Sequence, residues 1–247
     1  MTRPSAAWPL VCPALLSGLL LVIAAPVFAK DMEKGAAQRK LNAKELASLL
    51  DRLEKKLSKI RTMRADFIQE KHLSIFTDVV KAKGVLLFRK PDTVRFEMTK
   101  PFRSVLIAAG KSVAKYEFID GRWKKLKPEA SAARMVAEHI SLWLEARFRE
   151  KADLYDISAV AADTTIITLT PRNKKFRQFI TAIELTLHKS EEHFSAVTIR
   201  EPGGDFTRML FPHPKHDMDL PGKLFDTTGA APAPLDSPAE KSRTDAE

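Results

Sequence analysis

Residues 83–126, KGVLLFRKPDTVRFEMTKPFRSVLIAAGKSVAKYEFIDGRWKKL, decide the fold of this chain. They contain five short runs rich in apolar and β-branched side chains, at 83–89, 93–98, 104–108, 113–118 and 122–126. Turn residues separate the runs, and the Asp120-Gly121 pair between the last two is a strong hairpin signal. Consecutive short strands joined by tight turns predict an antiparallel meander rather than a parallel sheet.

The flanking sequence adds helices and further strands. Leucines recur at three- and four-residue steps over 41–62, opposite a lysine-rich face, which predicts an amphipathic helix. A second helix is predicted over 129–149. Period-two alternation predicts strands at 65–69, 154–158, 165–170, 182–187, 196–200 and 206–211. The expected fold class is therefore α+β, with the order helix, strands, helix, strands.

The two ends of the chain have a different composition from its centre. Residues 1–29 carry one charge and an apolar run that ends at Pro26-Val27-Phe28-Ala29, which predicts a secretory signal cut after Ala29. Residues 30–40 are expected to form a flexible leader, 41–226 the folded domain and 227–247 a disordered tail. Cys12 is the only cysteine, so an exported mature chain would contain no disulfide or thiolate site.

Composition gives no sign of catalysis. The chain carries a net charge of +10, which suits an anionic membrane or an acidic protein, and an exported protein seldom meets nucleic acid. It contains no Gly-x-Ser-x-Gly elbow and no phosphate-binding glycine loop. His213 and His216 have a spacing that can suit a metal, but neighbouring prolines exclude a helix and a third ligand is not obvious. We predict no enzyme, no metal and no cofactor.

Several strands carry apolar residues at adjacent positions, so both faces of the sheet are apolar. Val85-Leu86-Leu87-Phe88, Val105-Leu106-Ile107 and Ile166-Ile167 show this pattern. A sheet covered by one layer needs apolar residues only at alternate positions. Two interpretations remain open: a sheet packed or crowded on both sides, and a curved sheet with an apolar hollow that holds a ligand.

Two motifs follow one another in the first half of the chain: Ala65-Asp66-Phe67-Ile68-Gln69, and then the segment from Gly84 to Pro91. In their order and spacing they resemble the first strand and the Gly-x-Leu-x-x-x-Arg-Pro segment of the outer-membrane lipoprotein carrier protein family, LolA. The resemblance runs from about Leu46 to Phe225. The resemblance implies an unclosed, strongly curved antiparallel sheet, a half-barrel, with a helical lid over an apolar cavity.

The resemblance also implies a set of ligand-binding positions. Inward-facing strand residues would be Phe67, Leu86, Phe88, Phe96 and Ile107, and lid residues would be Val136, Ile140, Trp143 and Leu144. Lys90 stands where the family has an arginine that latches the lid through hydrogen bonds to helix groups. Lysine keeps the charge but loses the planar guanidinium fork. Arg89, one step away on the strand, is expected to point to the opposite face.

The function that the resemblance implies is transport across the periplasm. Such a carrier takes a lipoprotein, or another acylated lipid, from an inner-membrane ABC transporter and passes it to an outer-membrane receptor. We expect it to act as a monomer. The alternative is a lipid-sensing module of the same fold that acts through a protein partner, with a basic docking face that includes Arg95, Lys100, Arg103 and Arg122.

Overall fold

A computed structural model of the chain describes residues 38–126, 140, 142–144 and 146–235. The chain divides into two compact units, Met1–Gly35 and Ala36–Glu247, and all described residues belong to the second. The predicted signal at 1–29, Val136 and most of the predicted helix 129–149 therefore lie outside the described residues. Within the described residues, no helix is long and apolar enough to cross a membrane.

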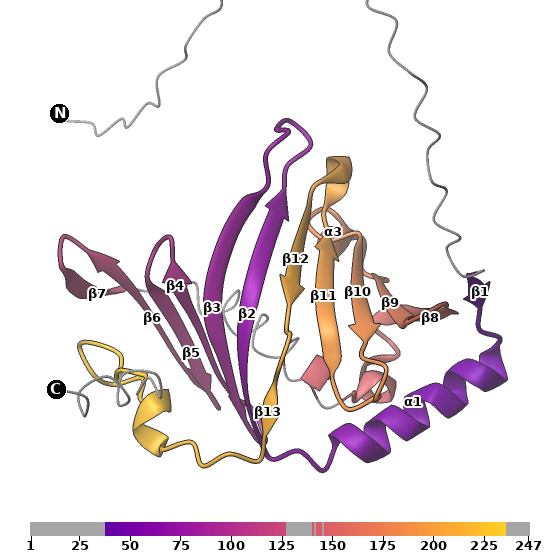
Figure 1. Ribbon diagram of the computed structural model, residues 1–247, viewed down its shortest axis with the longest axis horizontal. Coiled ribbons are helices and arrows are strands. Elements are labelled where there is room, and N and C mark those ends of the chain that lie inside the picture. The colour runs from indigo at the N-terminus through magenta and orange to yellow at the C-terminus, as the bar shows by residue number, and fades with distance from the viewer. Residues whose placement is uncertain (1–37, 127–139, 141, 145, 236–247) are drawn as a thin grey trace, which may run out of the picture. The chain divides into compact units, whose positions relative to one another are not determined.

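The described chain forms one antiparallel sheet with a few short helices (Figure 1). In sheet order its strands are β1 (Arg39–Lys40), β8 (Tyr155–Ala161), β9 (Thr165–Pro171), β10 (Ala182–Leu187), β11 (Phe194–Arg200), β12 (Phe206–Leu210), β2 (Thr62–His72), β3 (Val80–Arg89), β4 (Thr93–Lys100), β5 (Ser104–Ala109), β6 (Ser112–Ile119) and β7 (Arg122–Leu126). A short strand, β13 (Lys215–His216), also pairs with β2. Each predicted strand has its counterpart in this list.

The sheet is not closed, because β1 and β7 stand at opposite ends of the strand order. It is also not strongly curled. The prediction of an unclosed antiparallel sheet is thus confirmed, whereas the strong curvature of a half-barrel is not a feature of this structure.

The leucine-rich segment forms one helix, α1 (Ala43–Leu57), which is shorter than predicted. The Asn42 side chain accepts a hydrogen bond from the Glu45 amide, and Glu45 bonds back to the Asn42 amide, which completes a capping box. Four leucines of α1 are buried: Leu49, Leu50, Leu53 and Leu57. The helix ends at Leu57 because the chain turns into β2 five residues later.

Two hydrophobic clusters lie on opposite faces of the sheet. The larger cluster, on what we call the inner face, joins β2–β5 and β8–β12 to α1 and to Ile140, Leu142, Trp143, Ala146 and Phe148. The smaller cluster, on the outer face, joins Val85, Leu87, Val105, Ile107 and Tyr116 to a C-terminal segment. Side chains alternate between faces along a strand, so adjacent apolar residues serve the two clusters in turn.

Residues 220–235, which we call the strap, cover the outer face. The strap contains a short 3₁₀ turn, η3 (Gly222–Phe225), whose Leu224 and Phe225 are buried. Tyr116 donates to the carbonyl of Gly229 (3.0 Å), and Lys125 donates to that of Thr227 (2.7 Å). Residues 227–235, the first part of the predicted tail 227–247, contact the sheet in this way, and residues 236–247 lie outside the described residues.

The last residues of the predicted leader 30–40 belong to the sheet. Residues Arg39–Lys40 form β1 and pair with β8, and the Leu41 amide donates to the Ala159 carbonyl. Residues 30–37 lie outside the described residues.

Candidate functional site

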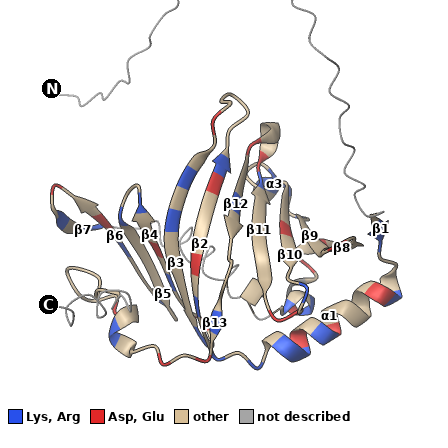
Figure 2. Cartoon of the chain, viewed as in Figure 1, with Lys and Arg blue, Asp and Glu red and all other residues tan. Residues whose placement is uncertain are grey.

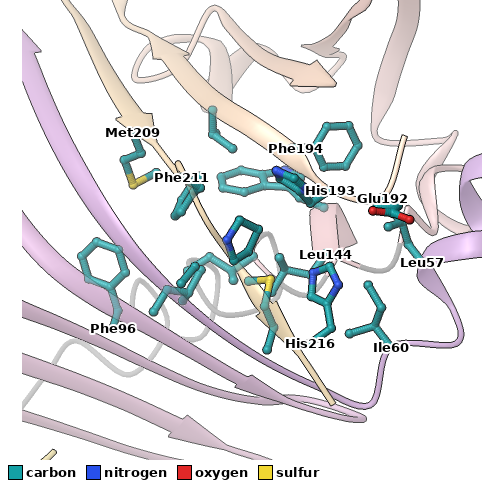
Figure 3. Close-up of a pocket in the computed structure, with 17 residues that line it drawn as sticks. Leu57, Ile60, Phe96, Leu144, Glu192, His193, Phe194, Met209, Phe211 and His216 are labelled. Carbon is teal, nitrogen blue, oxygen red and sulfur yellow. The ribbon is translucent and has the colours of Figure 1, made fainter. Parts of the chain in front are cut away.

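The inner face carries an enclosed apolar cavity that the chain fills almost completely (Figure 3). Its wall comes from β2, β3, β4, β11 and β12, and Leu57 and Ile60 close one side. The remaining volume is about 40 Å³, enough for a few water molecules. The lining is Leu57, Ile60, Met63, Ala65, Leu86, Phe96, Ile140, Trp143, Leu144, Glu192, His193, Phe194, Val197, Met209, Phe211, Pro214 and His216.

A second apolar space of about 410 Å³ adjoins the first. The two share Phe96 and Met209 of the sheet together with Ile140 and Trp143. The second space continues along Ile183 and Ile199 to the segment after β9, which we call the α3 loop (172–181) and which holds the short helix α3 (Lys174–Arg177). Its volume lies within the range of small-molecule sites.

The described residues between 140 and 148 pack on the inner face of the sheet. Ile140, Trp143 and Phe148 are all at most 6 % exposed. Arg149, just beyond, pairs with Asp51 of α1 and donates to the Ala47 carbonyl (3.3 Å). The segment is therefore held at one side by α1 and packs its apolar side chains against the sheet.

Six of the predicted binding residues contribute to the inner face in two ways. Leu86, Phe96, Ile140, Trp143 and Leu144 line the enclosed cavity. Phe67 lies behind this wall, 2 % exposed, and its ring stacks on that of Phe96 at 4.6 Å between centroids.

Phe88 and Ile107 complete the strand positions named from the sequence. Phe88 is buried in the inner cluster but does not line the cavity. Ile107 belongs to the outer cluster, so its predicted inward orientation is wrong. The register explains the error: Ile107 pairs with Arg95, while Phe96 pairs with Leu106, and paired residues point to the same face.

Lys90 ties the end of β3 to the end of α1. Its ammonium donates to the carbonyl of Ser58, the C-cap of the helix, and its amide donates to the Arg61 carbonyl (2.9 Å). A cation at a helix C-terminus is favourable. Arg89 points to the outer face as predicted, with its guanidinium 4.6 Å from the Phe225 ring centroid. Lys90 thus contacts a helix, but that helix is α1.

A group of histidines forms the polar corner of the enclosed cavity, and sequence reasoning did not identify it. The rings of His188 and His193 stack at 4.5 Å, and His216 meets His193 edge-on at 6.3 Å. Within the described residues, the Nε2 atoms of His193 and His216 are buried without a hydrogen-bond partner. The residues are far apart in sequence and meet because β13 and the β10–β11 turn lie at the same end of the sheet.

Burial disfavours the charged form of His193 and His216. Burial, with the neighbouring His188 and His216, lowers the pKa of His193 to about 4, and burial also lowers the pKa of His216. No group of three or more His, Cys, Asp or Glu within the described ranges could hold a metal ion. The corner therefore offers neutral hydrogen-bonding groups to whatever enters the cavity.

This histidine corner should make the protein sensitive to acid. The unfolded chain takes up protons below about pH 6.5, while the folded chain resists them until about pH 4, so stability falls as pH falls through this window. Because His193 is partly solvated, we expect a loss of about 1–2 kcal/mol, well below the full linkage value. Urea unfolding at several pH values measures it. His193→Gln should weaken the dependence of the free energy of unfolding on pH, and His72→Gln should leave it unchanged. Equal pH dependence in both variants would contradict the assignment of this effect to His193.

The outer face has a cavity of another kind. It measures about 780 Å³ and is lined by Arg64, Asp66, Arg103, His213 and Lys215 together with residues 232–235 of the strap. Arg95 lies beneath it, 1 % exposed, and donates to Glu97 (2.9 Å from Nε) and to the Leu224 carbonyl (2.9 Å). Arg95 is thus part of the fold and not of an exposed basic face. A polar cavity does not suit an acyl chain.

Solved structures with related folds are distant. A DUF1329 family protein from Desulfovibrio piger shares 10 % identity, covers 74 % of this chain and 97 % of its own, and has a TM-score of 0.45. A LolA superfamily protein from Nitrosomonas europaea shares 10 % identity over 73 % of this chain and 96 % of its own, with a TM-score of 0.40. MucB, in the Pseudomonas aeruginosa MucA/MucB complex, shares 15 % identity over 73 % of this chain, with a TM-score of 0.41; the match spans 60 % of that chain.

The sequence itself decides the family. No curated protein matches the chain at a significant level. The model of the family described as outer membrane lipoprotein carrier protein LolA matches residues 58–228, which include every strand from β2 to β13 and η3. The carrier proteins of that family are not enzymes. With its antiparallel sheet, apolar inner face and continuous match over most of its length, the chain belongs to the LolA family.

Proposed function

We propose that the protein is a periplasmic carrier that shelters the acyl chains of a lipoprotein or another lipid against the inner face of its sheet. It ferries this cargo from the inner to the outer membrane. The observation that supports the proposal is the pair of adjoining apolar spaces, which share Ile140 and Trp143 as lining residues. These two residues occupy the place of the cargo when the carrier is empty.

The free energies of apolar burial favour the replacement of Trp143 by lipid. Each buried methylene contributes about 0.8 kcal/mol, so a chain of ~16 carbons withdraws on the order of 13 kcal/mol from water. Releasing Trp143 from the inner face costs about 4–6 kcal/mol, from ~200 Å² of aromatic surface at ~25 cal/mol/Å². An acyl chain can therefore displace Trp143 from between the two spaces when the lid opens.

Carriage also requires loading and release at two membranes. An inner-membrane ABC transporter loads the carrier, and an outer-membrane receptor with higher affinity for the lipid accepts the cargo. The lid shifts between a closed empty state and an open loaded state, and the cargo favours the open state by its differential affinity.

The proposal is tested by purifying the protein from cells and measuring the mass of the intact complex. Native mass spectrometry should find a bound acylated molecule, and a fluorescent fatty acid should bind the delipidated protein and leave when natural lipid is added. Labelled lipid should then move from donor to acceptor vesicles only when the protein is present. Binding without transfer would point to a lipid sensor, and absence of both binding and copurified lipid refutes the proposal.

A charge in the larger apolar space should block binding. Ile199 lines this space from β11, is partly buried and tolerates a polar group better than the core positions do. Ile199→Glu places a carboxylate against the acyl chain, and we expect at least about a tenfold loss of affinity, the effect of displacing about two methylenes. Fluorescent fatty-acid titration measures it. Arg208→Glu, on the other face of the neighbouring strand β12, is the control and should bind normally.

A further inference from the structure

One end of the sheet collects the exposed hydrophobic side chains. The described residues expose eight large hydrophobic side chains, and the strand register places every one at the end where β2, β4, β6, β9 and β11 finish. We call this the apolar end. The eight are Ile75, Phe76, Val80, Phe102, Phe118, Ile119, Leu154 and Phe179. The turns at the opposite end of the strands contribute none within the described ranges.

The most exposed of these residues project from turns rather than pack on them. Ile75 (81 % exposed) and Phe76 lie in the β2–β3 turn, Phe102 (82 %) in the β4–β5 turn and Phe179 (70 %) in the α3 loop. The β2–β3 turn is held in place, because the Ser74 amide donates to Asp205 of the β11–β12 turn (2.7 Å). Fixed turns that present apolar side chains to solvent indicate a surface made for an apolar partner.

The same end carries cations without partners. Lys174, Lys175 and Arg177 of α3, Lys100 and Arg122 make no ion pair with any described residue, and Figure 2 shows basic residues at α3 and at the β6–β7 turn. The acidic groups there are mostly engaged. Lys81 pairs with Glu70 (3.6 Å), Lys71 with Glu201 (3.7 Å), Arg172 with Asp156 (2.8 Å) and Lys124 with Asp120 (3.1 Å). Asp78, Asp153 and Asp205 also lie at this end and make no ion pair with a described residue, but the five cations outnumber them, so the unpaired charge there is positive on balance.

We propose that the apolar end docks on an anionic lipid bilayer. Ile75, Phe76, Phe102 and Phe179 enter the boundary between headgroups and acyl chains, while the cations of α3 and the turns face the anionic headgroups. Apolar side chains flanked by Lys and Arg, on a segment with no spanning helix, are what an interfacial membrane contact requires. A soluble acidic protein would satisfy the cations but would not account for exposed aromatic rings spread over four different hairpins and loops.

The docked orientation would aim the larger apolar space at the membrane. Phe179 is mostly exposed and also lines that space, beside Phe176 and Ile180. An apolar path therefore runs from the bilayer side of the α3 loop to the inner face. This consequence rests on the proposed function; docking itself does not.

Vesicle flotation tests the proposal with the full chain. We expect at least tenfold more protein on vesicles of phosphatidylglycerol and phosphatidylcholine than on phosphatidylcholine alone. Raising the salt concentration about tenfold, which shortens the Debye length roughly threefold, should release much of it. Phe76→Ser/Phe179→Ser should lower binding at least tenfold without changing the circular dichroism, since both side chains are exposed.

Two controls separate docking from other causes. Lys174→Ser/Lys175→Ser should weaken binding to anionic vesicles, whereas Lys44→Ser/Lys189→Ser, which removes the same charge away from the apolar end, should not. Ile199→Glu should float like the wild type, so a failure of cargo binding is distinguishable from a failure of docking. Absence of wild-type flotation, or full flotation of the Phe76→Ser/Phe179→Ser variant, overturns the proposal and leaves the apolar end to a protein partner.

Discussion

Replacing Glu97 by leucine is expected to lower the free energy of unfolding by about 3 kcal/mol, the lower part of the range for breaking a buried ion pair. Glu97 neutralises Arg95, whose side chain is 1 % exposed on the outer face. Without Glu97 the guanidinium keeps only the carbonyl of Leu224 among its present partners in the described chain. The lower figure applies because a polar cavity lies beside the pair and admits water.

Equilibrium unfolding in guanidinium chloride measures this loss. The double variant Arg95→Met/Glu97→Leu is the informative comparison, because removing both charges avoids the unpaired guanidinium and should cost less than the single change. A single variant within about 0.5 kcal/mol of the wild type would mean that water already solvates Arg95. Limited proteolysis adds a local readout. Arg95 holds the strap through the Leu224 carbonyl, so proteases should cleave the strap faster in Glu97→Leu than in the wild type.

Gly84→Ala is the second change expected to have a large effect, also about 3 kcal/mol. A Cβ on Gly84 would lie 2.2 Å from the carbonyl oxygen of Glu97 and 2.3 Å from the ring of Phe67. One obstacle is backbone of the neighbouring strand, so β3 and β4 must separate locally. The other is a ring fixed by stacking on Phe96. Because Gly84 has no side chain, the Phe67 ring can occupy the space beside it.

A double-mutant cycle separates the energetic cost of the two contacts. Gly84→Ala should cost less in a Phe67→Ala background, because the ring clash is gone, and the remaining cost reports the contact with the Glu97 carbonyl. Gly222→Ala is a matched control: its Cβ would meet nothing closer than 3.9 Å, and thermal unfolding should barely change. Additive effects of Gly84→Ala and Phe67→Ala would show that the ring moves aside freely.

The strands were predictable because their signal is local. In the 83–126 stretch the turn residues Pro91, Pro101, Gly110 and Gly121 lie in or beside the turns of the structure, and the predicted strands match β3 to β7 within a few residues. The helix was predicted too long because the leucine pattern of α1 continues into Ile60 after the helix has ended. A periodic pattern marks the buried face of a segment better than it marks the segment's ends.

The residues of the site could be predicted only where the sequence shows which residues of a strand point to the inner face. Leu86 and Phe96 were placed correctly since the family pattern fixes β3 and β4. Ile107 failed because one step along β5 exchanges the faces. The histidine corner could not be predicted, because it depends on β13 pairing with β2, and a two-residue strand leaves no pattern.

The apolar character of both strand faces also had a simpler cause than a hollow. The strap covers the outer face, so Val85, Leu87 and Ile107 are core residues there. A strap built from Leu220, Leu224 and Phe225 among prolines and polar residues has no periodic signal. The pattern that suggested a cavity was therefore evidence for a second covering layer, and the support for a cargo site comes from the inner face alone.

An unclosed sheet leaves two strands with free backbone groups, and such strands invite other chains to add to them. Here β1 is two residues long and both are cations, Arg39 and Lys40. At the other border β7 has the sequence RWKKL and pairs only with β6 in the described chain. A second copy approaching the β7 border would bring like charges together, which opposes edge-to-edge pairing of the sheets. At the β1 border Arg39 is paired with Glu45, so the shortness of the strand, rather than its charge, limits pairing there.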